Sequence, residues 1–301
     1  HKNYNNISRS VIERINQIEA RMTINQEGGE INRLNASAGK EFVPLSEDTL
    51  FVLNKAKEYA QLSGGSFDMT VGPITKAWGI FTDSPKVPTR DEIQRLLNLV
   101  DYRDLEVIAD QSEARLKDSG QIVDLGAIAK GYAADEAIKI YKDNGVKSAF
   151  ISLGGNVATL GGKPDGTPWK VGIRNPRGPE GSYIGIVSVK DKAVVSSGDY
   201  ERYFEEDGVK YHHIMDPRTG YPSDSGLIGT TIISDASIDA DALSTAVFVM
   251  GLNEGLRFVE SLDGVEAVLI TDDKKVYVTT GLISSFEFKD GSKEFEYVEK
   301  R

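Results

Sequence analysis

The stretch ERYFEEDGVKYHHIM, residues 201–215, decides the fold class. Its two halves are rich in aromatic and polar residues that suit a half-buried strand, and Asp207-Gly208 between them is typical of a tight turn. We therefore predict a β-hairpin here. Further short runs with strand character lie on both sides, and turns join most of them. This pattern predicts an α+β protein with mostly antiparallel sheets packed with helices.

Helix signals surround these strands. Apolar residues recur every three or four positions from Ile7 to Met22, which predicts an amphipathic helix. Ser46 is a suitable N-cap for a second helix that ends near residues 63–65, and a capping box begins a third at Thr89. The remaining helices are predicted from about residue 127 to 145, over 238–251 and over 253–262. The segment SFDMTVGPITKAWGIF, residues 66–81, is predicted to be irregular.

Composition limits the classes of protein and partner. At 301 residues, of which 40% are hydrophobic, the chain can bury a substantial core. No linker rich in Pro, Ser or Gly divides it, so we predict one unit over residues 1–301. The formal charge of -11 repels phosphate backbones and anionic lipid, so we expect no nucleic-acid partner. The absence of cysteine excludes disulfides, thiolate zinc sites and a cysteine nucleophile.

A candidate cation site lies in the segment DADALSTA. Asp241 and Thr245 are four residues apart on a predicted helix, so their oxygens point the same way from adjacent turns. Carboxylate and hydroxyl oxygens suit Mg²⁺ or Ca²⁺. The alternative interpretation is an Asp that favours the helix dipole and a buried Thr that bonds back to the backbone. The spacing alone does not decide between them.

Two glycine-containing segments are candidates for binding an anionic ligand. In VDLGAIAKGYAAD, residues 123–135, Asp124 precedes a predicted helix N-terminus and Lys130 lies in its first turns, an arrangement that suits a phosphate. The segment SLGGN, residues 152–156, offers backbone that a ligand can approach closely. Each segment is equally explained by an ordinary tight turn.

Two of the three histidines are adjacent in the sequence. Neighbouring residues of a strand point to opposite faces, so at most one of His212 and His213 can enter a given site. His213 is a candidate general acid or base, and the alternative is that both are ordinary edge-strand residues. Motifs of serine hydrolases, P-loop proteins, zinc proteases and simple dinucleotide-binding folds are absent from the sequence.

The order of six segments resembles the ApbE family of flavin transferases. These segments are SFDMTVGPITKAWG, VDLGAIAKGYAAD, SLGGN, VVSSGDY, YHHIMDPRTGYP and DADALSTA. The resemblance implies a single ApbE-like, T-fold-related unit. It also implies an FAD:protein FMN transferase, which cleaves the FAD pyrophosphate and attaches FMN through a phosphoester to a Thr or Ser of an acceptor protein.

The resemblance implies roles for individual residues. Asp241 and Thr245 match side chains that bind Mg²⁺, and Ala127 matches a third ligand, which we expect to be its backbone carbonyl. His213 matches a residue proposed to assist the transfer, and the alternative base is Asp241 or a metal-bound water. The positions expected to hold FAD are Asn25, Ser66, Phe67, Asp68, Asp124, Lys130 and Met215.

The chain departs from its relatives at three points. Relatives carry a Met-Gly-Thr strand that contacts the nucleotide, and it has no counterpart before the helix that contains Ile7. Asn25 stands where some relatives have Tyr, and Lys130 stands where some have Glu. These departures concern the nucleotide-binding positions and leave the expected metal ligands intact.

Partners and location follow from the same resemblance. We expect FAD and an acceptor protein as partners, and contact with a membrane only through an N-terminal lipid anchor that the sequence does not include. Most bacterial relatives are exported and many are lipid-anchored, so the resemblance implies an extracytoplasmic, bacterial cell-surface or membrane-anchored lipoprotein. Two other functions remain open: a metal-dependent FAD pyrophosphatase that gives FMN and AMP, and a non-catalytic FAD-binding surface protein.

Overall fold

The computed structural model describes residues 4–298, and the chain divides into two compact units. The first, here the sheet unit, joins the residues up to Ile15, Lys130–Tyr200 and the residues from Asp224 on. The second, here the helical unit, joins Asn16–Ala129 and Glu201–Ser223. The prediction of one unit over residues 1–301 stays a prediction. No helix between residues 4 and 298 has the length and apolar character needed to cross a membrane.

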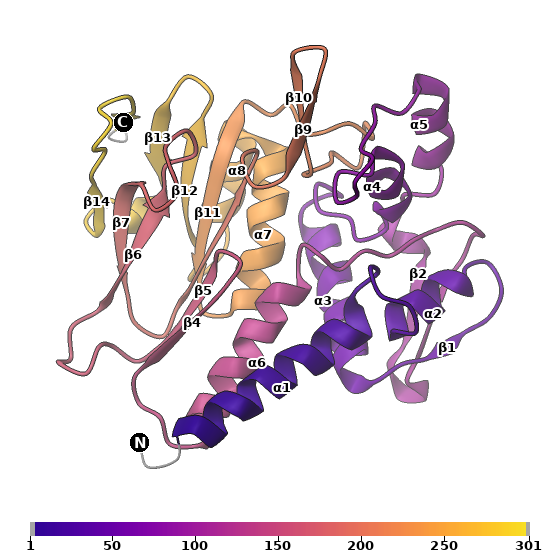
Figure 1. Ribbon diagram of the computed structural model, residues 1–301, viewed down its shortest axis with the longest axis horizontal. Coiled ribbons are helices and arrows are strands. Elements are labelled where there is room, and N and C mark those ends of the chain that lie inside the picture. The colour runs from indigo at the N-terminus through magenta and orange to yellow at the C-terminus, as the bar shows by residue number, and fades with distance from the viewer. Residues whose placement is uncertain (1–3, 299–301) are drawn as a thin grey trace. The chain divides into compact units, whose positions relative to one another are not determined.

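The sheet unit is built on a seven-stranded sheet with the order β15-β13-β12-β11-β8-β5-β4 among the described residues (Figure 1). Neighbouring strands are antiparallel except for the short pair β13 and β15. A second sheet has the order β14-β7-β6. The strands are β4 (Ala149–Leu153), β5 (Asn156–Leu160), β6 (Trp169–Arg174), β7 (Tyr183–Val189), β8 (Ala193–Gly198), β11 (Leu227–Ser234), β12 (Glu266–Thr271), β13 (Lys275–Val278), β14 (Phe286–Phe288) and β15 (Glu296–Tyr297). The prediction of an α+β fold with mostly antiparallel sheets is confirmed.

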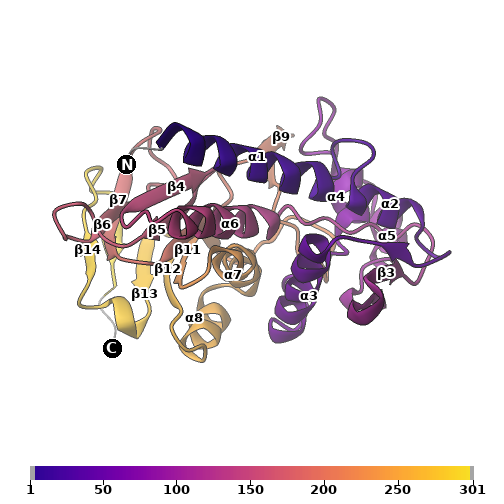
Figure 2. The ribbon, with the colours of Figure 1, turned by 90° about the horizontal axis from the view of Figure 1, so that it is seen from below.

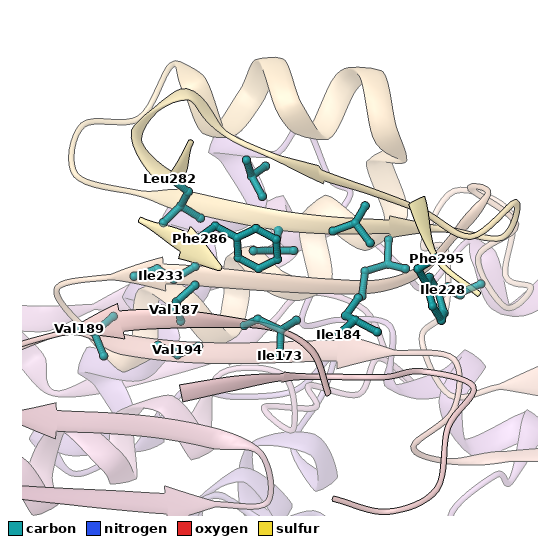
Figure 3. Packing of buried hydrophobic residues seen from close by; sticks show 14 residues of the cluster. Ile173, Ile184, Val187, Val189, Val194, Ile228, Ile233, Leu282, Phe286 and Phe295 are labelled. Carbon is teal, nitrogen blue, oxygen red and sulfur yellow. The ribbon is translucent and has the colours of Figure 1, made fainter. Parts of the chain in front are cut away.

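The two sheets of this unit share a hydrophobic core (Figure 3). Phe286 of β14 lies within it, and a Cβ placed on Gly185 of β7 would come within 2.3 Å of its ring. Only glycine therefore leaves room for the aromatic ring at this position. The buried members of the core are Ile173, Ile184, Val187, Val189, Val194, Ile228, Ile233, Val268, Ile270, Val276, Val278, Leu282, Phe286 and Phe295.

Helices cover the opposite face of the seven-stranded sheet. They are α6 (Ala129–Asp143), α7 (Ser237–Met250) and α8 (Leu252–Glu260), and a short 3₁₀ helix, η3 (Thr280–Leu282), follows β13. Hydrogen bonds join α7 to the sheet: the hydroxyls of Ser197 and Ser244 lie 2.7 Å apart, and Thr230 donates to the Ser244 carbonyl at 2.8 Å. All residues of β11 are buried because the strand is covered on both faces.

The helical unit contains mostly short elements. The helices are α1 (Tyr4–Met22), which begins in the sheet unit, α2 (Glu30–Ala36), α3 (Glu47–Leu62), α4 (Gly72–Trp78), α5 (Arg90–Leu97), η1 (Tyr102–Asp104) and η2 (Ala109–Gln111). The strands β1 (Val43–Pro44), β3 (Glu113–Leu116) and β2 (Leu105–Ile108) form one sheet, and β9 (Tyr203–Glu206) pairs with β10 (Val209–His212).

The helix caps and the hairpin turn predicted from the sequence form in this unit. The hydroxyls of Ser46 and Thr89 accept the backbone N–H groups of Thr49 and Glu92, so both predicted N-caps are confirmed. The predicted hairpin is β9–β10, and Asp207-Gly208 forms its turn with φ angles of 52° and 76°.

The prediction that residues 66–81 are irregular is wrong for Gly72–Trp78, which forms α4. Pro73 lies in its first turn, and Gly79 ends it in the left-handed conformation with φ of 62°. Trp78 is fully buried and donates from Nε1 to the Gly220 carbonyl at 2.8 Å. Its ring centroid lies 5.2 Å from that of Tyr211 in β10. Packing against the distant hairpin therefore stabilises a helix that is too short to form alone.

We expect Phe286→Ala to lower the free energy of unfolding by about 3 kcal/mol, because it leaves a cavity between the two sheets. Urea denaturation followed by circular dichroism measures this change. Phe150→Ala is the matched control, because Phe150 is 55% exposed, and its loss should change stability by less than about 1 kcal/mol. Equal effects of the two substitutions would contradict the placement of Phe286 in the core.

Candidate functional site

The candidate cation ligands lie in the first half of α7. Asp241 is 4% exposed, and its Oδ2 accepts the backbone N–H of Gly131 in α6 at 2.8 Å. Thr245 is half-buried, and its hydroxyl forms no hydrogen bond within residues 4–298. Thr245 therefore does not form the hydrogen bond to its own helix backbone that the alternative interpretation predicts. Asp241 Oδ1 and the Thr245 hydroxyl are both available to a ligand from the same helix face.

Helices α6 and α7 lie side by side in both views (Figures 1 and 2), and Gly131 of α6 lies against the first turn of α7. A Cβ at this position would lie 2.3 Å from the Ser237 carbonyl oxygen, so no larger residue fits. One turn further along α6, the carboxylate of Asp135 accepts the N–H groups of Ser237 at 2.7 Å and Ile238 at 2.9 Å. Three hydrogen bonds thus join α6 to the first turns of α7.

The donor set fits a hard divalent cation. A buried carboxylate that receives a single amide hydrogen bond is costly unless a further positive group approaches it. No group of three or more His, Cys, Asp or Glu side chains suited to a metal occurs among the described residues. A cation at Asp241 and Thr245 would therefore complete its coordination with other oxygens, as Mg²⁺ does with waters and substrate phosphates. Ala127 lies in a turn of the helical unit, and its part in such a site stays a prediction.

Two acidic residues predicted to hold FAD, Asp68 and Asp124, occupy neighbouring segments of the helical unit. The backbone N–H of Asp124 donates to the Met69 carbonyl at 2.8 Å, and its carboxylate accepts the Gly126 N–H at 2.9 Å. Asp68 is buried, and it accepts the N–H and hydroxyl of Thr70 at 2.7 and 2.6 Å. Burial raises the pKa of Asp68, although these hydrogen bonds oppose the shift.

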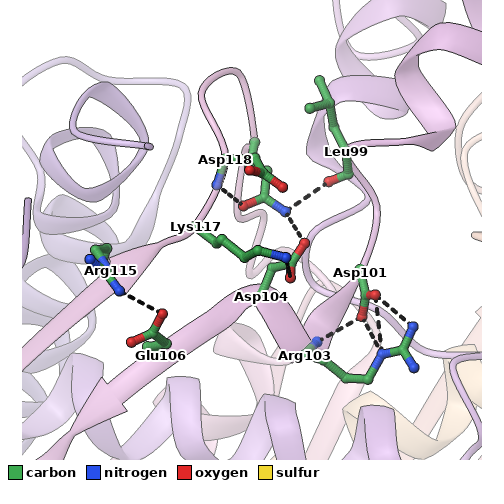
Figure 4. A network of polar contacts seen from close by, with 9 residues as sticks. Leu99, Asp101, Arg103, Asp104, Glu106, Arg115, Lys117 and Asp118 are labelled. Atoms are coloured by element: carbon green, nitrogen blue, oxygen red, sulfur yellow. Dashed lines mark hydrogen bonds and ion pairs between the residues drawn. The ribbon is translucent and has the colours of Figure 1, made fainter. Parts of the chain in front are cut away.

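A polar network surrounds the turn at residues 101–104, which contains Tyr102, a further hydrogen-bond partner of Asp68 (Figure 4). The Tyr102 N–H donates to the second carboxylate oxygen of Asp68 at 3.0 Å. On either side of Tyr102, Arg103 pairs with Asp101, and the buried Gln121 donates to Asp104 at 3.1 Å. The hydrogen bond from Arg103 lowers the pKa of Asp101. The network thus keeps the Tyr102 N–H directed at Asp68.

The other predicted FAD positions differ in exposure. Ser66 and Phe67 are buried, and Met215 is buried in a cluster with Ile74, Trp78 and Ile93. Asn25 is exposed in the turn after α1. Their contact with FAD stays a prediction. The buried residues would contact FAD through backbone atoms or after a small movement of their side chains.

Lys130 is exposed at the start of α6, and its side chain runs beside the turn between β4 and β5. A Cβ on Gly154 would lie 4.0 Å from Lys130 Cδ. Gly154 and Gly155 have φ of 54° and 98°, as a two-residue hairpin turn requires, which explains the glycine pair of SLGGN without a ligand. Contact of Lys130 with FAD stays a prediction.

The adjacent histidines have different surroundings. His212 is buried, and its Nε2 donates to the Ser223 carbonyl at 3.0 Å while its Nδ1 accepts the Ile214 N–H at 3.2 Å. His213 is half-buried, and its Nδ1 lies 3.2 Å from the Arg202 carbonyl. A carbonyl only accepts, so Nδ1 of His213 carries the proton and Nε2 carries the lone pair of the neutral ring. His213 therefore has the tautomer of a base that acts through Nε2.

The sequence did not assign a role to Gly131 or to Asp135. Both belong to the segment VDLGAIAKGYAAD, and they are four residues apart on a helix, so they share one face. That spacing is the signal that could have shown a common partner. Their common partner is the first turn of α7, which lies more than 100 residues away in the sequence. Only the tertiary fold brings it next to α6.

Fold and side chains together define a class of α+β protein with two features. A helix over an antiparallel sheet presents a buried carboxylate and a hydroxyl, and the segment that follows strand β10 presents a histidine whose Nδ1 lies at a backbone carbonyl. The ApbE family model matches residues 2–269. The chain belongs to the ApbE family, and the resemblance noted from its motifs is confirmed.

Named relatives and solved structures agree with this membership. The FAD:protein FMN transferase of Treponema pallidum is 36% identical, over 92% of this chain and 80% of that protein. The enzyme of the same name from Klebsiella pneumoniae is 34% identical, over 90% of this chain and 84% of that protein. The ApbE protein of Thermotoga maritima superposes with a TM-score of 0.86 at 33% identity, covering 92% of this chain and 90% of that one. The flavinyl transferase ApbE of Pseudomonas stutzeri has a TM-score of 0.83 at 27% identity, covering 96% and 90%.

Asp135 should give stability a distinct pH dependence. Burial raises its pKa from 3.8 to about 6, so the folded protein binds this proton more tightly than the unfolded chain does. Its protonation therefore favours folding fully below about pH 4, and that contribution disappears as the pH rises through about 6. We expect a loss on the order of 2 kcal/mol.

Urea denaturation of the parent protein and of Asp135→Asn at pH 4.5 and 7.5 measures this contribution. The parent should lose more stability than the variant between these two values, because the variant has no proton to release. An identical change in both proteins would contradict the raised pKa.

Proposed function

We propose that this protein is an FAD:protein FMN transferase that attaches FMN to a Thr or Ser hydroxyl of an acceptor protein. Membership of the ApbE family and the names of its relatives support flavin transfer. The observation that carries the proposal is the pair Asp241 and Thr245 in α7, where a buried carboxylate and a hydroxyl remain available on one helix face.

The reaction is a substitution at phosphorus. The acceptor oxygen forms a bond to the phosphorus of the FMN half of FAD, and the bond from that phosphorus to the bridging oxygen breaks. AMP leaves already ionised and needs little protonation, whereas the attacking hydroxyl is a weak nucleophile. His213 Nε2 accepts the hydroxyl proton, because Nδ1 already donates to the Arg202 carbonyl. Asp241 is the alternative base.

We assign Asp241, Thr245 and the Ala127 carbonyl to a Mg²⁺ site. When bound, this ion supplies positive charge against the two phosphates of FAD. The protein needs such charge because its own formal charge is -11 and an anionic dinucleotide is otherwise repelled. The side chains of this chain fix where that charge is placed.

The residues proposed to hold FAD act in different ways. Lys130 lies at the exposed start of α6, and Asp124 orders the turn before α6 through the Gly126 N–H. Asp68 shapes the backbone of its loop through Thr70 and Tyr102. The remaining positions in this proposal are Asn25, Ser66, Phe67 and Met215.

We propose an extracytoplasmic location, with attachment to a membrane through an N-terminal lipid anchor. The support is the family resemblance. Cell fractionation of the source bacterium with an antibody to this chain tests it, and recovery in the cytoplasmic fraction alone would contradict it.

Incubation with FAD, Mg²⁺ and a candidate acceptor protein tests the activity. A transferase leaves flavin fluorescence on the denatured acceptor band and adds the mass of FMN to a Thr or Ser. Release of free FMN and AMP without labelling would instead indicate a pyrophosphatase. Stoichiometric binding of FAD without AMP would indicate a non-catalytic protein.

We expect His213→Ala to slow FMN transfer by about 10²- to 10⁴-fold, the usual contribution of a general base, while FAD binding persists. Single-turnover labelling of the acceptor measures the rate, and fluorescence quenching measures FAD affinity. Added imidazole should restore part of the rate by supplying the missing base. Transfer by the variant at the parental rate would show that His213 is not the base.

We expect Asp241→Asn to raise the Mg²⁺ concentration for half-maximal transfer by about tenfold or more, because the amide keeps a hydrogen-bond acceptor but loses the charge. A Mg²⁺ titration of the transfer rate measures this shift. Asp263→Asn is the control, since it removes one charge from an exposed position outside the proposed site. Equal Mg²⁺ dependence of the two variants would remove Asp241 from the metal site.

A further inference from the structure

We infer that Asp135 is a positioning residue for the metal-binding pair of α7. It would not contact the metal or FAD, and it would act through the backbone of the first turn of α7. This inference rests on the proposed function, because it assumes that Asp241 and Thr245 bind a divalent cation.

The hydrogen bonds between α6 and α7 run in both directions. Gly131 donates its N–H to the Asp241 carboxylate at 2.8 Å, while Asp135 accepts from Ser237 at 2.7 Å and from Ile238 at 2.9 Å. One contact fixes the carboxylate itself, and the other two fix the start of the helix that carries it. Together they restrict both the rotation and the sliding of α7 against α6.

The start of α7 depends on an acceptor from another helix. The first N–H groups of any α-helix lack partners within the helix, and a Ser, Thr, Asp or Asn at the N-cap usually provides one. The N-cap of α7 is Ala236, which forms no side-chain cap. Asp135 supplies the missing acceptor to two of these groups. Without it, the turn just before Asp241 loses its side-chain cap and should open more often.

Both oxygens of Asp135 are used for this purpose, one for each amide. Asp135 therefore directs both oxygens at the backbone of α7. Asp241 has the opposite pattern, because only its Oδ2 accepts a hydrogen bond within the described residues. The two carboxylates thus have separate tasks, one in binding and one in orientation.

Asp135→Asn is the direct test, because it keeps the shape of the side chain but leaves only one acceptor oxygen for two donors. Glu136→Gln is the matched control. It removes the same charge from the next position of α6, where Glu136 pairs with Arg14 at 2.7 Å and forms no hydrogen bond or ion pair with α7 within residues 4–298. Mn²⁺ is the probe, and its binding is followed by electron paramagnetic resonance without FAD or acceptor.

We expect Asp135→Asn to weaken Mn²⁺ binding by tenfold or more and Glu136→Gln to change it by less than twofold. Hydrogen exchange at the amides of Ser237 and Ile238 should quicken tenfold or more in Asp135→Asn only. FAD affinity in the absence of metal should not change. In the Asp241→Asn background, Asp135→Asn should have no further effect on Mn²⁺ affinity, since it acts through that carboxylate.

Asp135→Glu separates position from charge and serves if the Asn variant does not fold. It keeps the charge but displaces the carboxylate by one methylene, so we expect weaker Mn²⁺ binding here too. Parental Mn²⁺ affinity in Asp135→Asn or in Asp135→Glu would overturn the inference, and faster amide exchange alone would reduce Asp135 to a helix cap. If the parent protein neither binds Mn²⁺ nor transfers FMN, the proposed function itself fails.

Discussion

The close approach of α6 and α7 at Gly131 is the constraint on which the sheet unit's candidate chemistry depends. Two helices can come this near only where one of them lacks a side chain, since a Cβ would lie 2.3 Å from the Ser237 carbonyl oxygen. At that distance a backbone N–H of α6 reaches the carboxylate of Asp241. A buried acidic group thereby acquires a fixed orientation and keeps one oxygen for a ligand.

Hydrogen bonds also hold α7 on the sheet. The Ser244 hydroxyl bonds to that of Ser197 in β8, and the Ser244 carbonyl accepts the hydroxyl of Thr230 in β11. The start of α7 is tied to α6 through Asp135. A helix held from two sides keeps its outward oxygens in place, and coordination of a cation requires such fixed geometry.

The helical unit uses buried polar groups differently. The Asp68 carboxylate accepts hydrogen bonds from Thr70 and Tyr102 and so fixes the shape of its loop. His212 bonds to the backbone of both Ser223 and Ile214. The Nδ1 of His213, the next residue, lies 3.2 Å from the Arg202 carbonyl, and its ring packs edge-on against Phe81. The adjacent histidines therefore have different roles. His212 stabilises the backbone around it, and His213 has a tautomer suited to proton transfer.

Much of the fold was determined by local signals in the sequence. The caps at Ser46 and Thr89 and the hairpin turn at Asp207-Gly208 form as predicted, because each depends on hydrogen bonds or dihedral preferences within four residues. The helix α4 did not follow from local signals. It contains seven residues and depends on the burial of Trp78 against a hairpin that is more than 100 residues away.

The candidate residues show the same division. The sequence by itself determined that Asp241 and Thr245 share a helix face, and that only one of two neighbouring histidines can serve a site, because helix and strand periods fix these relations. Tertiary structure alone decided that Asp241 is buried beneath the N–H of Gly131, that Asp135 caps α7, and that His213 presents Nε2 as its basic nitrogen. The physical reason is that burial and hydrogen-bond partners depend on contacts between distant segments, which no local pattern encodes.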